Sequence, residues 1–255
     1  MRAPGITHAR STSALLYLSG VSVSFDGFKA VSELNLYIDK GELRVIIGPN
    51  GAGKTTVLDL ICGRTKVSAG SIKFKDQEIT GLKEQKIVRL GIGRKFQTPT
   101  IYEDLTVFEN LEISIPRGRN VAGALMWRRS DEVIHEVREI AAMIFLSDQL
   151  DRMAETLSHG QKQWLEIGML LIQDPELLML DEPVAGMSVS ERARTAELLE
   201  LVSKGRSVIV IEHDMKFVES IAHRITVLHQ GQVLAEGNMD AIQDNPRVKE
   251  VYLGH

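Results

Sequence analysis

The segment Gly48-Pro49-Asn50-Gly51-Ala52-Gly53-Lys54-Thr55 constrains the fold of this chain more than any other part of the sequence. It matches the pattern of a phosphate-binding loop. A nearly continuous apolar run at residues 43–47 precedes it, and a helical pattern over residues 54–62, closed by Gly63, follows it. The alternative is a chance glycine-rich helix entry, which the flanking strand and helix patterns disfavour. The sequence therefore predicts a strand, loop and helix at the centre of an α/β domain.

The residue types in this loop fit the binding of a nucleotide triphosphate. Glycines let the backbone wrap around a phosphate, and the N–H groups at the start of the helix favour negative charge. Lys54 would reach the β and γ phosphates, and Thr55 would ligate Mg²⁺. The expected nucleotide-binding residues of this segment are Gly48, Pro49, Asn50, Gly51, Ala52, Gly53, Lys54, Thr55 and Thr56.

An acidic pair, Asp181 and Glu182, directly follows the apolar run at residues 177–180. Ligands bind at the carboxyl ends of parallel strands, so we expect this pair to lie opposite the phosphate-binding loop. Asp181 would then help to hold Mg²⁺, and Glu182 would act as general base toward an attacking water. The alternative is a polar strand end without a chemical role.

The order of the other patterns predicts an α/β fold whose core is split in sequence. Alternating patterns at residues 17–25, 28–31 and 34–38 predict an N-terminal antiparallel sheet. Helical patterns replace strand patterns between about residues 97 and 157, where Thr106 and Glu109 form a capping-box pattern. Strand patterns return at residues 177–180 and 208–211, and a closing hairpin is expected at residues 225–228 and 232–235. We expect a flexible extension over residues 1–14 and one domain over residues 15–255, with a helical subdomain at about residues 98–175 inserted in its core.

Composition argues against a protein that binds nucleic acid, binds anionic lipid directly or spans a membrane. Apolar residues make up 44% of the chain, and the net charge of −4 gives no overall attraction to nucleic acid or anionic lipid. The single cysteine, Cys62, cannot form an internal disulfide, which fits a reducing compartment. No apolar run approaches the roughly 18 residues of a membrane-spanning helix, so any membrane role needs a protein partner.

Further motifs give the chain a resemblance to a family. Leu157-Ser158-His159-Gly160-Gln161 resembles the signature motif of the ATP-binding cassette (ABC) ATPases, which usually has glycine in place of His159. With Ser158 as N-cap, Ser158, Gly160 and Gln161 would form a second anion-binding end that faces a γ-phosphate held by another subunit.

Three more positions match the family pattern. The resemblance implies that Gln97 contacts Mg²⁺ and water, that His213 contacts the γ-phosphate, and that Phe25, 54 − 25 = 29 residues before Lys54, stacks on adenine. Taken singly, these residues have plainer alternatives: a loop glutamine, a strand-end histidine and a core aromatic. The implied catalytic set is Glu182, His213 and Gln97, and the implied metal ligands are Thr55, Gln97 and Asp181.

The resemblance covers about residues 16–253 and implies the ABC ATPase fold: a RecA-like P-loop core, an antiparallel β-subdomain and an α-helical subdomain. It implies ATP and Mg²⁺ as cofactors, and a nucleotide-sandwich dimer with a related ATPase or a second copy of this chain. Transmembrane permease subunits and, indirectly, a solute-binding protein are the other implied partners. This arrangement would place the chain at the cytoplasmic face of the inner (plasma) membrane, without nucleic acid.

The solute is predicted from resemblance alone. Residues 91–97, 105–111 and 181–187 are similar to the branched-chain amino-acid class. Within it, residues 158–169 and 251–254 most resemble the urea-uptake ATP-binding subunits. Urea is therefore the predicted solute, and a branched-chain amino acid or an amide is the alternative.

Other classes fit the sequence less well. A soluble ABC ATPase of DNA repair would insert a long coiled coil between Lys54 and Ser158, and one of translation would carry two cassettes. A non-hydrolysing module would usually lack Glu182 or His213. A dinucleotide-binding enzyme would need glycine at position 96, which is Phe96. His159 and the segment 185–188, which lacks an aspartate common in the family, are departures from the family pattern, and no catalytic role is expected of residues 185–188.

Overall fold

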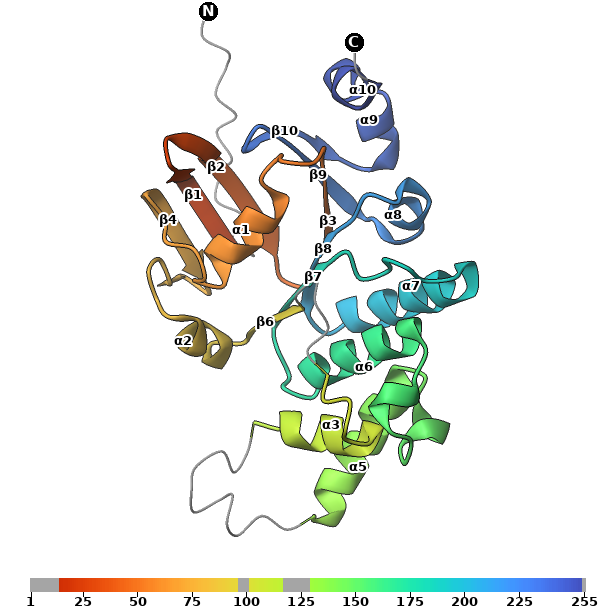
Figure 1. Cartoon of the computed structure of the whole chain (residues 1–255). Helices are drawn as coiled ribbons and strands as arrows, with labels where there is room; N and C mark the ends of the chain where they lie inside the picture. Colours follow the sequence, from red (N-terminus) through yellow and green to blue (C-terminus); the bar gives the residue numbers. More distant parts are fainter. Residues whose placement is uncertain (1–13, 96–100, 117–128, 254–255) are drawn as a thin grey trace, which may run out of the picture.

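The computed structural model describes residues 14–95, 101–116 and 129–253, apart from the side chains of residues 252 and 253. Figure 1 shows two sheets, with helices packed around the larger one. The strands are β1 (Ala14–Phe25), β2 (Phe28–Asp39), β3 (Leu43–Ile47), β4 (Ala69–Phe74), β5 (Gln77–Glu78), β6 (Ile92–Lys95), β7 (Leu177–Asp181), β8 (Ser207–Ile211), β9 (Arg224–His229) and β10 (Gln232–Gly237). The helices are α1 (Lys54–Ile61), α2 (Glu84–Arg89), α3 (Val107–Ser114), α5 (Asp131–Met143), α6 (His159–Leu171), α7 (Val189–Ser203), α8 (Met215–Ile221), α9 (Met239–Gln243) and α10 (Pro246–Leu253), with short 3-10 turns at Ser147–Gln149 and Ala154–Thr156.

The larger sheet has the strand order β10-β9-β3-β8-β7-β6. Its strands run parallel except β10, which forms an antiparallel hairpin with β9. Every residue of β3, β7 and β8 is buried, as expected of strands covered on both faces. The predicted parallel sheet, split in sequence between β3 and β7, is therefore confirmed.

The two faces of this sheet pack against different partners, because successive side chains of a strand point to opposite faces. On β3, Leu43, Val45 and Ile47 join the apolar cluster that includes residues of α3, α5, α6, α7 and α8. Ile46 joins the cluster built from α1 and the smaller sheet. The sheet thus forms the middle layer between the helices on one side and α1 with the smaller sheet on the other.

The smaller sheet is antiparallel, with the order β2-β1-β4-β5, and confirms the predicted N-terminal sheet. The division of its second half into two strands is wrong, because β2 runs unbroken from Phe28 to Asp39. Glu33 has a φ of 48°, the register shifts near it, and its N–H donates to the Ser22 hydroxyl at 2.8 Å. A bulge bends the strand here without ending it.

Helices α3, α5 and α6 pack against one another at the end of the molecule opposite the smaller sheet (Figure 1). The Thr106–Glu109 capping box that begins α3 is present as predicted. On α5, Val133, Val137 and Ala141 face the core, at the spacing of an amphipathic helix. The proposed division of the chain into an extension, a core and an inserted helical subdomain stays a prediction.

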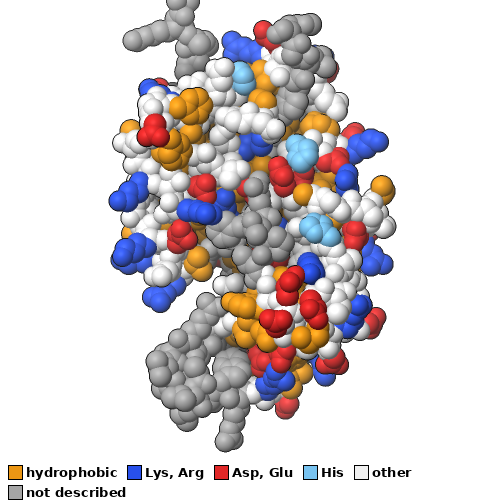
Figure 2. Space-filling view, viewed as in Figure 1, with side chains coloured by type: hydrophobic (Ala, Val, Ile, Leu, Met, Phe, Trp, Pro, Cys, Tyr) orange, Lys and Arg blue, Asp and Glu red, His pale blue; other side chains and the backbone are white. Residues whose placement is uncertain are grey.

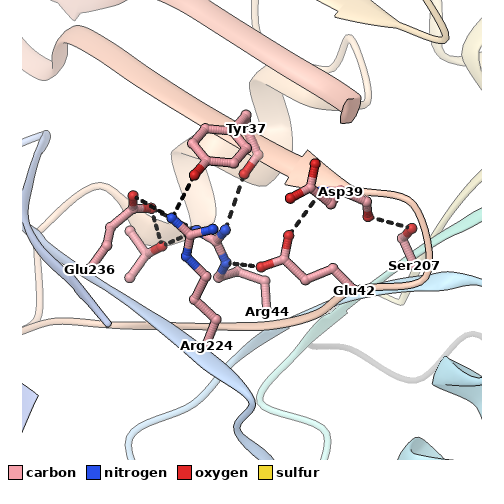
Figure 3. Close-up of polar contacts among 8 residues, drawn as sticks. Tyr37, Asp39, Glu42, Arg44, Ser207, Arg224 and Glu236 are labelled. Atoms are coloured by element: carbon pink, nitrogen blue, oxygen red, sulfur yellow. Dashed lines mark hydrogen bonds and ion pairs between the residues drawn. The ribbon is translucent and has the colours of Figure 1, made fainter. Parts of the chain in front are cut away.

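A buried polar cluster joins the two sheets at the edge where β3 and β9 begin. The Arg44 guanidinium, fully buried on β3, donates to Glu42 Oε1 at 2.6 Å, to Glu236 Oε1 at 2.6 Å and to the Tyr37 carbonyl at 3.3 Å. Arg224 donates to the Tyr37 hydroxyl at 2.7 Å. Figure 3 shows these groups pointing toward one another from β2, β3, β9 and β10. The cluster connects the smaller sheet to the larger one.

Acidic and basic side chains are interspersed over the face shown in Figure 2. Among the described residues visible there, no continuous basic stripe crosses this face, whereas nucleic-acid binding proteins commonly cluster Lys and Arg in one. Within the described ranges, no helix is long and apolar enough to cross a membrane.

Candidate active site

The loop between β3 and α1 needs glycine at its two ends. Gly48 follows the last residue of β3, and a Cβ there would lie 2.3 Å from the Leu228 carbonyl oxygen. Gly53 is the N-cap of α1 with a φ of 97°, and a Cβ there would lie 2.6 Å from the Ala30 carbonyl oxygen. Both positions exclude a side chain, and Gly53 also has a backbone conformation that L residues rarely adopt. This explains the glycines of the predicted phosphate-binding loop.

The start of α1 has the properties of an anion site. Among the described residues no side chain caps the helix, so its first N–H groups are available to another acceptor. Asn50, Gly51 and Thr55 are exposed, while Pro49, Gly53 and Thr56 are partly buried and Ala52 is buried. The predicted loop residues therefore form one partly exposed turn at the helix start.

Lys54 lies over this turn. Its ammonium donates to the carbonyl oxygens of Gly48 at 2.7 Å and Pro49 at 3.0 Å. Burial lowers the pKa of Lys54, and the nearby carboxylates of Glu182 and Asp181 oppose that shift. The ammonium is thus held at the loop with two carboxylates close by.

Asp181 ends β7, which β8 separates from β3 in the sheet order. Its side chain is 1% exposed, and among the described residues neither carboxylate oxygen has a well-formed hydrogen bond. Burial raises the pKa of Asp181, while the Thr55 hydroxyl and the Arg94 guanidinium, 3.9 Å away, oppose that rise. Two orphaned carboxylate oxygens beside a hydroxyl match the hard oxygen ligands that Mg²⁺ prefers.

Glu182 and His213 face each other from adjacent strands. Glu182 follows β7 with a φ of 48°, and its N–H donates to the Ile211 carbonyl at 3.0 Å. His213 lies two residues beyond β8, and its Nδ1 is 3.5 Å from Glu182 Oε1. The Glu182 side chain is one-third exposed and that of His213 two-thirds exposed, so water reaches both. Strained backbone of this kind clusters at functional sites.

Phe25 ends β1 opposite Phe28. Its side chain is 48% exposed, so the core-aromatic alternative is wrong. Gln97, the remaining predicted catalytic and metal-binding residue, lies outside the described residues.

The signature-like segment forms the start of α6, which is well separated from α1 in Figure 1. Ser158 is the N-cap and forms a capping box with Gln161. The Ser158 hydroxyl also donates to Glu191 Oε1 at 3.2 Å, and a Cβ on Gly160 would lie 2.3 Å from that oxygen. The structure thus joins Ser158, Gly160 and Gln161 to one another but not to the loop at residues 48–53.

The two departures from the family pattern contact each other. His159 Nε2 lies 3.0 Å from the Ala185 carbonyl oxygen, and the His159 ring packs where Gly186 has no side chain. The start of α6 is therefore connected to the turn that follows Glu182. Neither contact has a local sequence signal, because residues 159 and 185 are 26 positions apart.

Two buried groups near the site were not predicted. Arg94 binds Asp59 at 2.6 Å and lies close to Asp181. Glu212, directly after β8, is 2% exposed and accepts backbone N–H groups from Val184, His213 and Asp214. In the sequence, only its position directly after the apolar run at residues 208–211 distinguishes Glu212.

Comparisons with known proteins agree with this geometry. The family model described as ABC transporter matches residues 31–185, and the model for branched-chain amino acid ATP-binding cassette transporters matches residues 232–255. The high-affinity branched-chain amino acid transport ATP-binding protein BraF of Pseudomonas aeruginosa is 39% identical, covering 94% of this chain and 98% of that protein. LivG of Escherichia coli K12, with the same description, is 37% identical over the same shares of each chain.

Solved structures with this fold include an ATP-binding cassette of an ABC transporter in its ADP conformation. It is 33% identical with a TM-score of 0.84, covering 96% of this chain and all of that chain. A nucleotide-free cassette is 31% identical with a TM-score of 0.81, covering 95% of this chain and all of that chain. A third cassette, described as a dimeric post-hydrolysis state bound to ADP and phosphate, is 25% identical with a TM-score of 0.75, covering 88% of this chain and 98% of that chain.

Proposed function

Because this chain belongs to the ATP-binding subunits of ABC transporters, in their branched-chain amino-acid class, we propose that it hydrolyses ATP with Glu182 and His213. ATP hydrolysis coupled to transport is the reaction of this family. The observation that carries the assignment is the convergence of Lys54, Asp181, Glu182 and His213 at the carboxyl edge of β3, β7 and β8.

In this proposal different residues of the chain bind the nucleotide and promote its hydrolysis. The loop at residues 48–53 and the start of α1 cradle the phosphates, Thr56 lies in the first turn, and Phe25 stacks on the base. Lys54 exchanges its loop carbonyl contacts for phosphate oxygens. Glu182 accepts a proton from the attacking water, and His213 orients Glu182 and the γ-phosphate.

Mg²⁺ would be held by Thr55, Asp181 and Gln97, and it would neutralise charge on the phosphate oxygens. Across the described part of the chain, no cluster of three His, Cys, Asp or Glu side chains could hold a metal. Three side chains make up only part of the shell that Mg²⁺ needs, and we expect the cation to arrive together with the nucleotide, as is usual for Mg²⁺.

ABC ATPase domains act as dimers with transmembrane permease subunits. In the proposed dimer, Ser158, Gly160 and Gln161 of each chain face the nucleotide of the other. A related ATPase subunit is the proposed partner, and a second copy of this chain is the alternative. Binding to the permease would hold the chain at the cytoplasmic face of the inner membrane.

The solute is better supported as a branched-chain amino acid or an amide than as urea. The relatives described above are branched-chain amino acid transport proteins, and none of them is described as a urea transporter. Urea rests only on the motif resemblance at residues 158–169 and 251–254. Uptake of labelled leucine and of labelled urea by cells that lack this chain, complemented with wild type or Glu182→Gln, distinguishes the two: the true solute is taken up only with wild type.

The activity is tested with Glu182→Gln, and Glu176→Gln serves as control because it makes the same change just before β7, at the other end of that strand. We expect Glu182→Gln to bind ATP normally and to lose roughly 10²- to 10⁴-fold in hydrolysis rate, the usual share of a general base. It should also accumulate a Mg²⁺-ATP-dependent dimer, alone or with the partner subunit, by light scattering. Full hydrolysis by Glu182→Gln, or by a strict monomer, would contradict the proposal.

A further inference from the structure

Glu212 is a buried carboxylate to which the proposed mechanism assigns no role. It follows β8 and its own N–H donates to the Ile46 carbonyl of β3 at 3.3 Å, so the backbone there is still part of the sheet. Its side chain lies within the protein, at 2% exposure. Among the described residues it forms no ion pair with Lys or Arg. A buried charge without a cation is costly unless hydrogen bonds compensate it.

The compensation comes from two separate loops. Oε1 accepts the Val184 N–H at 3.3 Å, two residues after Glu182. Oε2 accepts the N–H of His213 at 3.1 Å and that of Asp214 at 3.5 Å. One carboxylate thus fixes the turn that follows Glu182 and the turn that carries His213. Those two side chains face each other at 3.5 Å.

We propose that Glu212 is a positioning residue, which holds Glu182 and His213 at the separation that hydrolysis requires; this rests on the proposed function. Glu182 leaves β7 with a φ of 48°, so its turn needs outside support to keep that conformation. Glu212 supplies the support from the neighbouring strand. It touches neither the loop at residues 48–53 nor Lys54 in the contacts of the described residues.

Only a carboxylate can accept hydrogen bonds from all three N–H groups. It has two oxygens with about four acceptor sites and no donor, whereas a glutamine would turn an NH₂ group toward one of the loops. Burial raises the pKa of Glu212, and the N–H groups of His213, Val184 and Asp214 oppose that rise, as does the charge of His213 when protonated. Glutamine at this position therefore keeps the shape of the side chain but releases one of the two turns.

The test compares Glu212→Gln with Glu236→Gln. Glu236 is a largely buried carboxylate of the same sheet, in the cluster joining β2, β3, β9 and β10, and so controls for stability. Amide hydrogen exchange at residues 184, 213 and 214 measures whether the hydrogen bonds to residue 212 persist. ATP affinity measures whether the proposed nucleotide site is intact, and kcat and KM measure ATP hydrolysis. The partner subunit is included where hydrolysis requires the dimer.

For Glu212→Gln we expect exchange to accelerate by roughly tenfold at the amides of one turn or both. We expect kcat to fall by roughly 10- to 100-fold, the scale of a small misplacement, with KM and ATP affinity within about twofold of wild type. Glu236→Gln should leave kcat and these amides unchanged. A kcat for Glu212→Gln within about twofold of wild type would overturn the inference.

A second variant separates positioning from general damage. Because Glu212 acts through both Glu182 and His213, adding Glu212→Gln to a variant that already carries Glu182→Gln and His213→Ala should change the residual single-turnover rate by less than about twofold. A further tenfold loss in the triple variant overturns the inference. If the wild-type chain does not bind ATP, the proposed function itself is overturned. Failure of the proposed function can therefore be distinguished from failure of the inference about Glu212.

Discussion

Replacing Arg44 by methionine removes the central cation of the polar cluster in Figure 3. Arg44 is fully buried, and its guanidinium donates to Glu42 and Glu236, both at 2.6 Å. Methionine fills much of the space of the arginine stem but leaves these carboxylates, only 12% and 13% exposed, without that cation. Arg224, 3.5 Å from Glu236, compensates in part.

Breaking a buried ion pair by removing one partner costs about 3–5 kcal/mol, and we expect Arg44→Met to lie in this range. For a chain of this size that corresponds to a fall in Tm of roughly 6–20 °C. Urea unfolding followed by circular dichroism measures the loss. ATP affinity of the folded variant should not change, because the cluster lies at the edge of the sheet opposite the loop at residues 48–53.

The cause of the loss can be isolated with a triple variant that joins Arg44→Met to Glu42→Gln and Glu236→Gln. Neutralising both carboxylates removes the unpaired charges, so most of the lost stability should return. If Arg44→Met alone costs less than about 1 kcal/mol, the buried cation does not hold the two sheets together and the reasoning is refuted.

Three further substitutions test the site. Asp181→Asn should stabilise the nucleotide-free protein at neutral pH, by about 1.4 kcal/mol for each pH unit by which the folded pKa of Asp181 exceeds its ordinary value. Because the folded pKa is raised, this gain should shrink as the pH falls from the raised pKa to the ordinary one. Urea unfolding between pH 3 and 8 measures the change. Gly53→Ala should abolish ATP binding in a titration, since φ is 97° and the Ala30 carbonyl would be 2.6 Å from the new Cβ, whereas Gly205→Ala, which meets open space, should bind normally. Ser158→Ala should lose about 1 kcal/mol with its helix cap. It should bind ATP normally as a monomer but fail to form the ATP-dependent dimer in light scattering.

The parts of the fold that were predictable from sequence follow local rules. The strands β3, β7 and β8 are mostly apolar because both faces are covered, and the glycines around Lys54 are fixed by backbone geometry within the loop. The hairpin between β9 and β10 has two residues with positive φ, Gln230 and Gly231, which is the turn expected for a two-residue connection.

Other parts depend on contacts between residues far apart in the sequence. Strand β6 was missed because it reads Ile-Gly-Arg-Lys, yet its Arg94 and Lys95 are buried against Asp59 and Glu166. Arg94 and Asp59 are 35 positions apart. Glu212 and Val184 are 28 positions apart, so the role proposed for Glu212 required the structure.

Insertion of the helical segments between β3 and β8 also determines when the central sheet can form during synthesis. Leu43 pairs with Val208, and 208 − 43 = 165 residues separate them. At about 5–20 residues per second, the ribosome adds that stretch in roughly 8–33 s. Strands β1 and β2 can pair early because a two-residue turn joins them, while the apolar strand β3 must wait without its neighbours on either side. For those seconds the newly made chain exposes an unpaired, mostly hydrophobic strand, which makes it prone to aggregate before it can become a subunit of a transporter.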